Sequence, residues 1–265
     1  MVIDFHAHAF PDARAPSVMD NMDRVAGIPR YADGTVKGLL KSMDLSGVGL
    51  SVVSRITTVA SSVPEVNDWL ASLRTKKLEA AATLHPDTPD LFGELNRIKA
   101  LGFHGLKLHP DYQGFHVYEK RMFPLYDAIR GAGLWILFHA GLDRGLPGAP
   151  LRCTPRGLKE VHDNFPGLTL IAAHMGGEGI YDETEEYLVG TEVYLDTSFV
   201  LRKMPEDTLK RMVKNHTTRR IIYGSDTPWS DQSNDIGFLR SRPYLSETDV
   251  DCMVRENALK LLGRA

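Results

Sequence analysis

The sequence predicts an α/β fold, a TIM-type (β/α)8 barrel formed by residues 1–265 as a single domain. Three observations support this fold class. The chain has 265 residues, close to the roughly 250 residues that such a barrel needs. Short apolar runs alternate with amphipathic segments along its length. Several of the apolar runs end in a His or Asp followed by loop residues.

The strand candidates are short apolar runs with little alternation between apolar and polar residues. Runs of this kind are typical of strands buried on both faces, as in a parallel sheet. Eight of them occur in order, at residues 2–5, 48–54, 78–84, 104–108, 134–138, 168–173, 192–196 and 220–224.

The segments between these strands have apolar residues at helical spacing. Thr88-Pro89 and Thr154-Pro155 are good helix starts, since Thr caps the first turn and Pro suits its first position. An eightfold β-α alternation favours a closed parallel barrel, with a doubly wound open sheet as the alternative. The stretches 9–34 and 141–153 are rich in Gly and Pro, and we expect them to form elaborated loops at the active-site end. Helices are expected at 35–46, 63–75, 88–100, 120–130, 154–164, 183–189, 205–214 and 246–262.

Composition excludes several classes of protein. Hydrophobic residues make up 43% of the chain and charged residues 25%, and the net charge is −3 without a long basic run. These values give no reason to expect binding to nucleic acid or to an anionic membrane surface. No stretch of about 20 apolar residues and no signal-peptide pattern is visible. Cys153 and Cys252 are expected to be reduced thiols, which suggests a cytoplasmic protein. We expect it to act on a small molecule, as a monomer or a homo-oligomer.

The first strand ends in a pair of histidines, in the sequence Asp4-Phe5-His6-Ala7-His8. Side chains alternate faces along a strand, so His6 and His8 point the same way. Two adjacent imidazoles at the end of a buried strand form half of a metal site.

Three later strands end in a similar way, at His139, His174 and Asp226. His139 and His174 are 35 residues apart (174 − 139), which fits consecutive strand–helix units, and Asp226 fits two strands later. In a (β/α)8 barrel the active site forms at the carboxyl ends of the strands. We therefore expect these residues to meet His6 and His8 in one cleft.

In these motifs the sequence resembles the amidohydrolase superfamily, and more closely the branch that includes aminocarboxymuconate semialdehyde decarboxylase and γ-resorcylate decarboxylase. The resemblance covers essentially the whole chain. It implies the metal-dependent hydrolase fold and one divalent metal ion per chain, usually zinc, held by His6, His8, His139 and Asp226. It also implies that His174 lies beside the metal, where it moves protons or polarises the substrate. The motifs are Asp4-Phe5-His6-Ala7-His8, Phe138-His139-Ala140-Gly141, Ala173-His174-Met175-Gly176-Gly177 and Gly224-Ser225-Asp226-Thr227-Pro228.

This set of ligands suits zinc, with manganese or iron as alternatives. A catalytic metal keeps a position open and lowers the pKa of its bound water toward about 7. Asp226 is well suited to accept a proton from that water. His174 is well suited to act as a general acid, and a role in orienting a ligand is the alternative.

Lys107 ends the fourth strand. In binuclear members of the superfamily a carboxylated lysine at this place bridges two metals, although such a bridge is not usual in the decarboxylase-like branch. Lys107 could instead hold a substrate carboxylate or pair with an acidic neighbour. For His109, two residues further on, we expect a hydrogen-bonding role near the rim of the cleft.

Arg55 and Arg144 follow strands and could bind a substrate carboxylate bidentately, and surface salt bridges are the alternative. Trp229 is a candidate for the pocket wall. Together with Lys107 the two arginines would make the mouth of the cleft locally positive, which predicts a small substrate with a carboxylate.

The sequence leaves the reaction open. The first interpretation is hydrolysis of an ester, lactone or amide by a metal-activated water. The alternative is non-oxidative decarboxylation of an aromatic or unsaturated carboxylic acid at the same site. A further alternative is a metal-binding barrel without catalytic activity.

Overall fold

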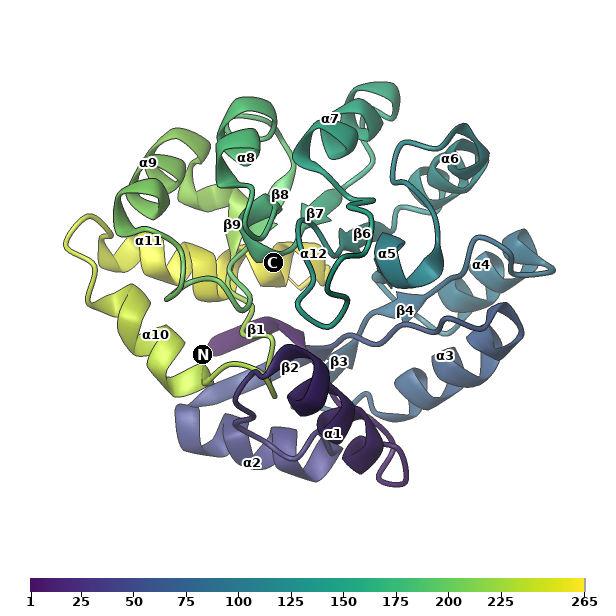
Figure 1. The fold of residues 1–265 in the computed structure, drawn as a ribbon, viewed down its shortest axis with the longest axis horizontal. Helices are drawn as coiled ribbons and strands as arrows, with labels where there is room; N and C mark the ends of the chain where they lie inside the picture. The colour runs from purple at the N-terminus through teal and green to yellow at the C-terminus, as the bar shows by residue number, and fades with distance from the viewer. Residues whose placement is uncertain (265) are drawn as a thin grey trace.

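The strands form a closed ring of parallel strands surrounded by helices, which is the predicted (β/α)8 barrel (Figure 1). The computed structural model describes residues 1–264, and residue 265 lies outside the described residues. Every strand pair is parallel. The strands are β1 (Val2–Ala7), β2 (Val48–Val53), β3 (Leu78–Ala80), β4 (Ala82–Thr83), β5 (Gly105–Leu108), β6 (Trp135–Phe138), β7 (Leu170–Ala172), β8 (Tyr194–Asp196) and β9 (Ile221–Ile222).

Two connections close the ring. β3 and β4 are one predicted strand, 78–84, interrupted at Ala81, whose amide donates to the carbonyl of Val53 over 3.0 Å. At the other junction the Phe5 amide donates to the carbonyl of Tyr223 over 2.9 Å, which joins β1 to the end of β9. Eight strand positions therefore surround the barrel axis, as the sequence predicts.

The helices lie outside the ring (Figure 1). Most of them occupy the predicted segments, with shifts of up to three residues at their ends. The predicted start at Thr88-Pro89 is wrong, because that helix begins at Leu91 and is capped by Asp90, whose side chain accepts from the Gly93 amide. The predicted start at Thr154-Pro155 is confirmed. The α-helices are α1 (Ala15–Ala26), α2 (Val36–Ser46), α3 (Val63–Ser72), α4 (Leu91–Ala100), α5 (Pro110–Gln113), α6 (Phe123–Gly131), α7 (Pro155–Asn164), α8 (Tyr181–Tyr187), α9 (Glu206–His216), α10 (Gln232–Arg240), α11 (Glu247–Asp251) and α12 (Asn257–Leu261).

Four segments differ from the expectation, one of them the short helix α5, which lies in no predicted helix. The stretch 9–34 is not wholly loop, because it contains α1. Pro16 occupies the first turn of this helix, where no amide partner is needed, and Gly27 ends it at a φ of 59°. Helix α10 lacks a clear apolar periodicity and was not expected. The C-terminal helix is interrupted by a π-helical turn, Cys252–Glu256.

Two apolar layers hold the barrel together. One lies between the strands and the surrounding helices. The other fills the barrel interior, where Ile3, Phe5 and Leu137 pack with Ala258 and Leu262 of the C-terminal segment. That segment therefore closes the bottom of the barrel and leaves the carboxyl ends of the strands for the site. None of the helices in residues 1–264 has the length and apolar character needed to cross a membrane.

Candidate metal centre and its cleft

A cleft of about 360 Å³ opens at the carboxyl ends of the strands. Helix α1 and the connection between β6 and α7 contribute to its walls and lie on the near face of the barrel in Figure 1. All ten site residues predicted from the sequence line this one cleft: His6, His8, Arg55, Lys107, His109, His139, Arg144, His174, Asp226 and Trp229.

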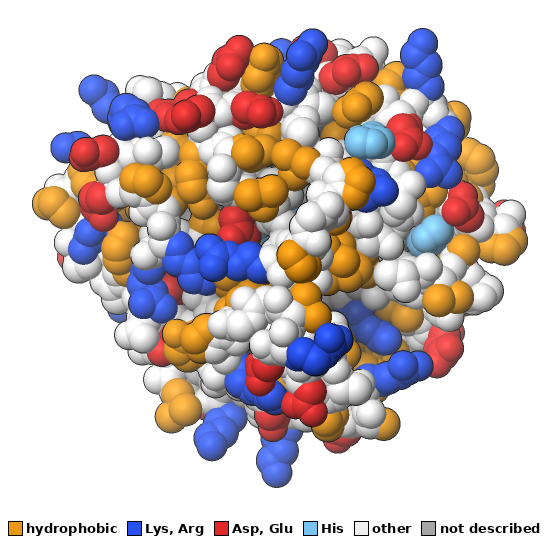
Figure 2. Space-filling view, in the orientation of Figure 1, with side chains coloured by type: hydrophobic (Ala, Val, Ile, Leu, Met, Phe, Trp, Pro, Cys, Tyr) orange, Lys and Arg blue, Asp and Glu red, His pale blue; other side chains and the backbone are white. Residues whose placement is uncertain are grey.

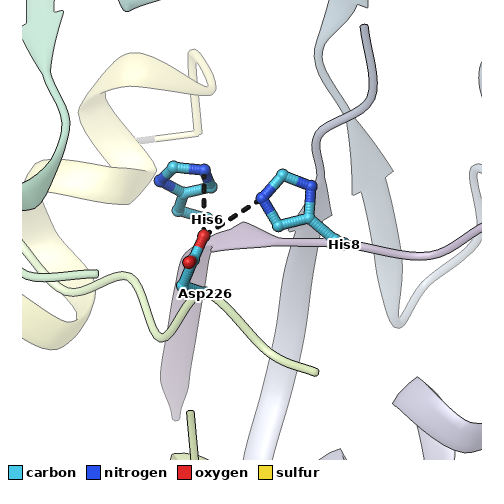
Figure 3. A group of neighbouring side chains, drawn as sticks. All are labelled: His6, His8 and Asp226. Carbon is cyan, nitrogen blue, oxygen red and sulfur yellow. Dashed lines mark hydrogen bonds and ion pairs between the residues drawn. The ribbon is translucent and has the colours of Figure 1, made fainter. Parts of the chain in front are cut away.

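His6, His8 and Asp226 form a compact group at the floor of the cleft (Figure 3). The two histidines come from β1 and the residue just after it, and Asp226 follows β9. Asp226 Oδ1 lies 3.1 Å from His8 Nε2 and 3.5 Å from His6 Nε2. We call these three residues the β1 trio. The predicted convergence of the histidine pair with Asp226 is thus observed.

Each histidine of the β1 trio is fixed through its other nitrogen. His6 Nδ1 donates to Asp196 Oδ2 over 2.8 Å, and His8 Nδ1 donates to the Ser54 carbonyl over 2.7 Å. With the proton on Nδ1, the lone pair of each Nε2 faces Asp226 Oδ1. Metal-binding histidines typically have such a partner on the far side of the ring.

Asp4 holds together the two segments that carry the β1 trio. This carboxylate is buried, and it accepts from the His6 amide over 3.1 Å and from the Ser225 amide over 2.9 Å. Gln232 Nε2 donates to it over 2.7 Å. Burial raises the pKa of Asp4 to about 6, although these hydrogen bonds oppose the rise. Asp4 therefore fixes the start of β1 against the segment that ends in Asp226.

The protonation states at the floor suit metal binding. Burial and, after it, the positive charge of Lys107 lower the pKa of His6 to about 4. Burial alone would raise the pKa of Asp226, but the close contact with His8 and the nearby histidines hold it well below its usual value. At neutral pH the floor therefore offers neutral imidazole and an ionised carboxylate, which are the forms that bind a divalent ion.

Lys107 reaches the same floor from β5. Its Nζ lies 3.1 Å from His6 Nε2, and burial lowers its pKa to about 8. Asp196 and Asp226 oppose this shift. The lysine thus contacts the predicted metal ligand His6 directly.

His139 and His174 form a hydrogen-bonded chain beside the β1 trio. His139 Nδ1 lies 3.0 Å from His174 Nε2, and His174 Nδ1 donates to the Ser198 carbonyl over 3.0 Å. The buried Nε2 of His139 has no hydrogen-bond partner within residues 1–264. His139 is not part of the β1 trio, whose ligand atoms all lie within 4.8 Å of one another. The structure thus groups three of the four predicted metal ligands and places the fourth nearby with a free nitrogen.

A second group of similar composition lies on the neighbouring strands. His109, His139 and Asp143 offer ligand-type atoms within 4.8 Å of one another. His109 Nε2 donates to Asp143 Oδ2 over 2.8 Å. The rings of His109 and His139 are stacked, with centroids 4.0 Å apart and an angle of 9° between their planes. We call these residues the β5–β6 trio. His109 is therefore buried against a histidine and an aspartate, deeper than the predicted place near the rim.

The cations of the cleft differ in their partners. Arg144 Nε donates to Glu178 Oε1 over 2.9 Å, so the predicted substrate contact competes with an ion pair. Arg55 lies over the ring of Trp69, 5.3 Å from its centroid, and makes no ion pair with any of residues 1–264. Trp229 packs against His8, with ring centroids 5.1 Å apart, and forms part of the wall as predicted.

Backbone strain is concentrated at the cleft. Among residues 1–264, five non-glycine residues have positive φ, and three of them line the cleft: His174 (58°), Phe199 (64°) and Asp226 (69°). Such conformations cost free energy and persist where the surrounding structure imposes them, which is common at functional sites.

Sequence reasoning missed the acidic residues that support the histidines. Asp196 ends β8 and is followed by Thr-Ser, so it shares the pattern of an apolar run that ends in a polar residue and could have been found. Asp143 and Glu178 lie in connections after strands, where the sequence carries no comparable signal.

Comparison with known proteins agrees with this architecture. Residues 3–264 match the family model described as amidohydrolase. An uncharacterised TIM-barrel protein of Bordetella bronchiseptica is 17% identical, with a TM-score of 0.78 and coverage of 99% of this chain and 98% of that one. 5-Carboxyvanillate decarboxylase of Sphingomonas paucimobilis is 18% identical, with a TM-score of 0.74 and coverage of 99% and 98%. The 5-carboxyvanillate decarboxylase of Novosphingobium aromaticivorans, in complex with manganese and 4-hydroxy-3-methoxy-5-nitrobenzoic acid, is 16% identical, with a TM-score of 0.73 and coverage of 99% and 96%. No curated protein sequence matches the chain.

Proposed function

The chain belongs to the amidohydrolase family, and on this premise we propose that it is a metal-dependent, non-oxidative decarboxylase of a small aromatic or unsaturated carboxylic acid. The sequence alone put hydrolysis first. The structural neighbours include several decarboxylases of aromatic acids, and this supports the reverse order. The neighbours are less than 20% identical, so the proposal depends mainly on the chemistry of the cleft.

The observation that carries the proposal is that Arg55 has no ion-pair partner among residues 1–264. It lines a cleft that also has apolar walls and a floor of histidine and carboxylate side chains. Arg55 is partly buried, and a guanidinium without a carboxylate partner is well matched to a carboxylate on the substrate. Phe10, Phe199 and Trp229 line the same cleft and provide flat apolar surfaces for an unsaturated ring. Lysine and arginine side chains also gather near the centre of this face (Figure 2).

His6, His8 and Asp226 would hold the divalent ion, manganese or zinc, with His139 as the fourth ligand. His6 and His8 are held through Nδ1 with Nε2 toward Asp226, and the buried Nε2 of His139 has no hydrogen-bond partner within residues 1–264, which fits this assignment. When bound, the ion supplies positive charge that holds the oxygens of an anionic substrate and stabilises charge that develops on it.

In the reaction the bond between the ring carbon and the carboxylate breaks and carbon dioxide leaves. The electron pair stays on the ring carbon, which takes up a proton. We assign this proton to His174, whose ring lines the cleft: the imidazolium gives up its Nε2 proton and regains one from solvent, while Nδ1 stays bonded to the Ser198 carbonyl. Asp226 stays ionised at the floor, and Arg55 keeps the substrate oriented.

The direct test is turnover of aromatic acids by the manganese- or zinc-loaded protein. 2,6-Dihydroxybenzoate and 5-carboxyvanillate are the first probes, with aryl esters and lactones as the hydrolase panel. We expect release of carbon dioxide and, in heavy water, one deuterium on the carbon that carried the carboxylate. Hydrolysis of the esters or lactones without carbon dioxide from any acid would restore the hydrolase interpretation.

Replacing Arg55 tests the carboxylate contact. Arg55→Met should raise KM for a substrate acid about tenfold or more, since it removes a charge-assisted hydrogen bond. Arg156→Met, on exposed α7, is the matched control and should leave KM unchanged. An unchanged KM in Arg55→Met would remove Arg55 from the substrate site.

A further inference from the structure

The β5–β6 trio has the composition of a metal site, but its geometry does not allow one. The lone pair of an imidazole nitrogen lies in the plane of its ring, and zinc–nitrogen bonds are about 2.0–2.1 Å long. The rings of His109 and His139 are nearly parallel, with centroids 4.0 Å apart. An ion cannot lie in both ring planes and within bonding distance of both nitrogens. His109 and His139 therefore do not share an ion.

The same contacts suit a different role. Asp143 is anchored on both oxygens, because Oδ1 accepts from the Gly145 amide over 2.6 Å and Oδ2 accepts from His109 Nε2. His109 is held in its own plane by this bond, and Tyr112 packs edge-on against it with ring centroids 4.6 Å apart. The ring of His109, held in this way, stacks on the ring of His139 and restricts its rotation.

The orientation of His139 depends on packing against a neighbouring ring more than that of His6 or His8 does. His6 and His8 each donate an Nδ1 proton to a fixed oxygen on the far side of the ring. The Nδ1 of His139 instead meets another histidine, His174, and its Nε2 has no partner. Stacking on His109 therefore acts together with the hydrogen bond to His174 in setting the plane of the His139 ring.

We propose that Asp143 and His109 are positioning residues that orient His139 toward the metal centre and so raise the affinity of the protein for its divalent ion. The proposal rests on the assignment of His139 as the fourth ligand in the proposed function. Asp143 directly precedes Arg144 in the connection between β6 and α7, so the same segment carries a cleft cation and the support of a metal ligand. Outer groups of this kind typically contribute a factor of 10–100 to metal affinity.

The experiment measures the affinity of the full chain for zinc alone, by competition with a chromophoric chelator. Asp143→Asn should weaken zinc binding about 10- to 100-fold, because an amide holds His109 less strongly than a carboxylate does. His109→Phe keeps a flat ring that can stack but cannot bond to Asp143, and it should weaken zinc binding about tenfold. Asp87→Asn is the matched control, since Asp87 lies 3.8 Å from His85 outside the cleft, and its zinc affinity should equal that of the unmodified protein.

Thermal unfolding of the metal-free variants separates positioning from general destabilisation. The proposal expects weaker zinc binding without a fall in Tm of more than a few degrees, and a changed visible spectrum when cobalt replaces zinc. Unchanged zinc affinity in either variant overturns it, as does a lower Tm with unchanged affinity. Should Asp143→Asn fail to fold, His109→Phe decides alone. Should the unmodified protein loaded with zinc release no carbon dioxide from any acid while both variants bind zinc more weakly, the decarboxylase proposal would be contradicted and the positioning role would stand.

Discussion

The cleft contains two groups of two histidines and one aspartate, and they differ in orientation rather than composition. In the β1 trio, the Nε2 atoms of His6 and His8 both face Asp226 Oδ1. In the β5–β6 trio, two imidazole rings lie face to face and the aspartate bonds one of them at its edge. Each group keeps its ligand-type atoms within 4.8 Å. Proximity of ligand-type residues therefore does not define a metal site, whereas convergence of their lone pairs does.

The largest expected effect follows from the aspartate of the β1 trio. Asp226→Asn removes the charge on which both Nε2 atoms converge, and we expect turnover to fall about 10³-fold, within the range for a directly reacting or ligating group. Zinc affinity should fall further than in Asp143→Asn. Elemental analysis and chelator competition on the two variants in parallel provide the measurement. Equal zinc affinities in the two variants would contradict the difference in role between the trios.

His174 is a further test of the two trios, because it contacts His139 without belonging to either of them. His174→Asn should keep about one metal ion per chain and lose turnover about 10²-fold, the scale of a general acid. The measurement is metal content and initial rate on the same preparation. A variant that loses its metal and recovers full activity on reloading would make His174 a ligand instead of the proton donor.

Asp196 tests the outer support of the β1 trio, as Asp143 tests that of the other. Besides His6 Nδ1, this carboxylate holds the backbone amides of His174 and Ser198 over 3.1 and 2.9 Å. Asp196→Asn should weaken zinc affinity about 10- to 100-fold. An affinity equal to that of the unmodified protein would show that His6 is oriented by its strand alone.

The smallest effect on function is expected for His216, a buried histidine that belongs to neither trio. Burial lowers its pKa to about 4, and it accepts a hydrogen bond from the Gly190 amide through Nδ1 over 3.1 Å. The unfolded chain takes up this proton near pH 6.5 and the folded chain only near pH 4, so stability is lost as pH falls through that window.

The variant His216→Asn keeps an acceptor for Gly190 and removes the titration. Relative to this variant, the unmodified metal-free protein should lose up to about 3 kcal/mol of unfolding free energy between pH 7 and pH 4. Urea titrations at several pH values measure the difference. Parallel pH dependences in the two proteins would mean that His216 titrates alike in the folded and unfolded chains.

The fold and the members of the β1 trio could be predicted because both depend on regular spacing. Strand runs and the His6–His8 pair are periodic features, and the barrel rule then brings Asp226 to the same end. The orientation of His109 against His139 could not be predicted, since it depends on Asp143 in an irregular connection and on the angle between two rings. Helix α1 could not be predicted for a related reason. Its proline and glycine are typical of loops but here occupy the first turn and the end of a helix.

The contact between His8 and Asp226 joins residues 218 positions apart in the chain. Contacts of such high sequence separation form late in folding, because the entropy of closing a long loop must be offset first. An ion held by both residues can bind only after the ring has closed between β1 and β9. Metal uptake therefore reports that the barrel has closed. At a hundredfold excess over its Kd the ion would add about 2.7 kcal/mol to the stability of the closed state.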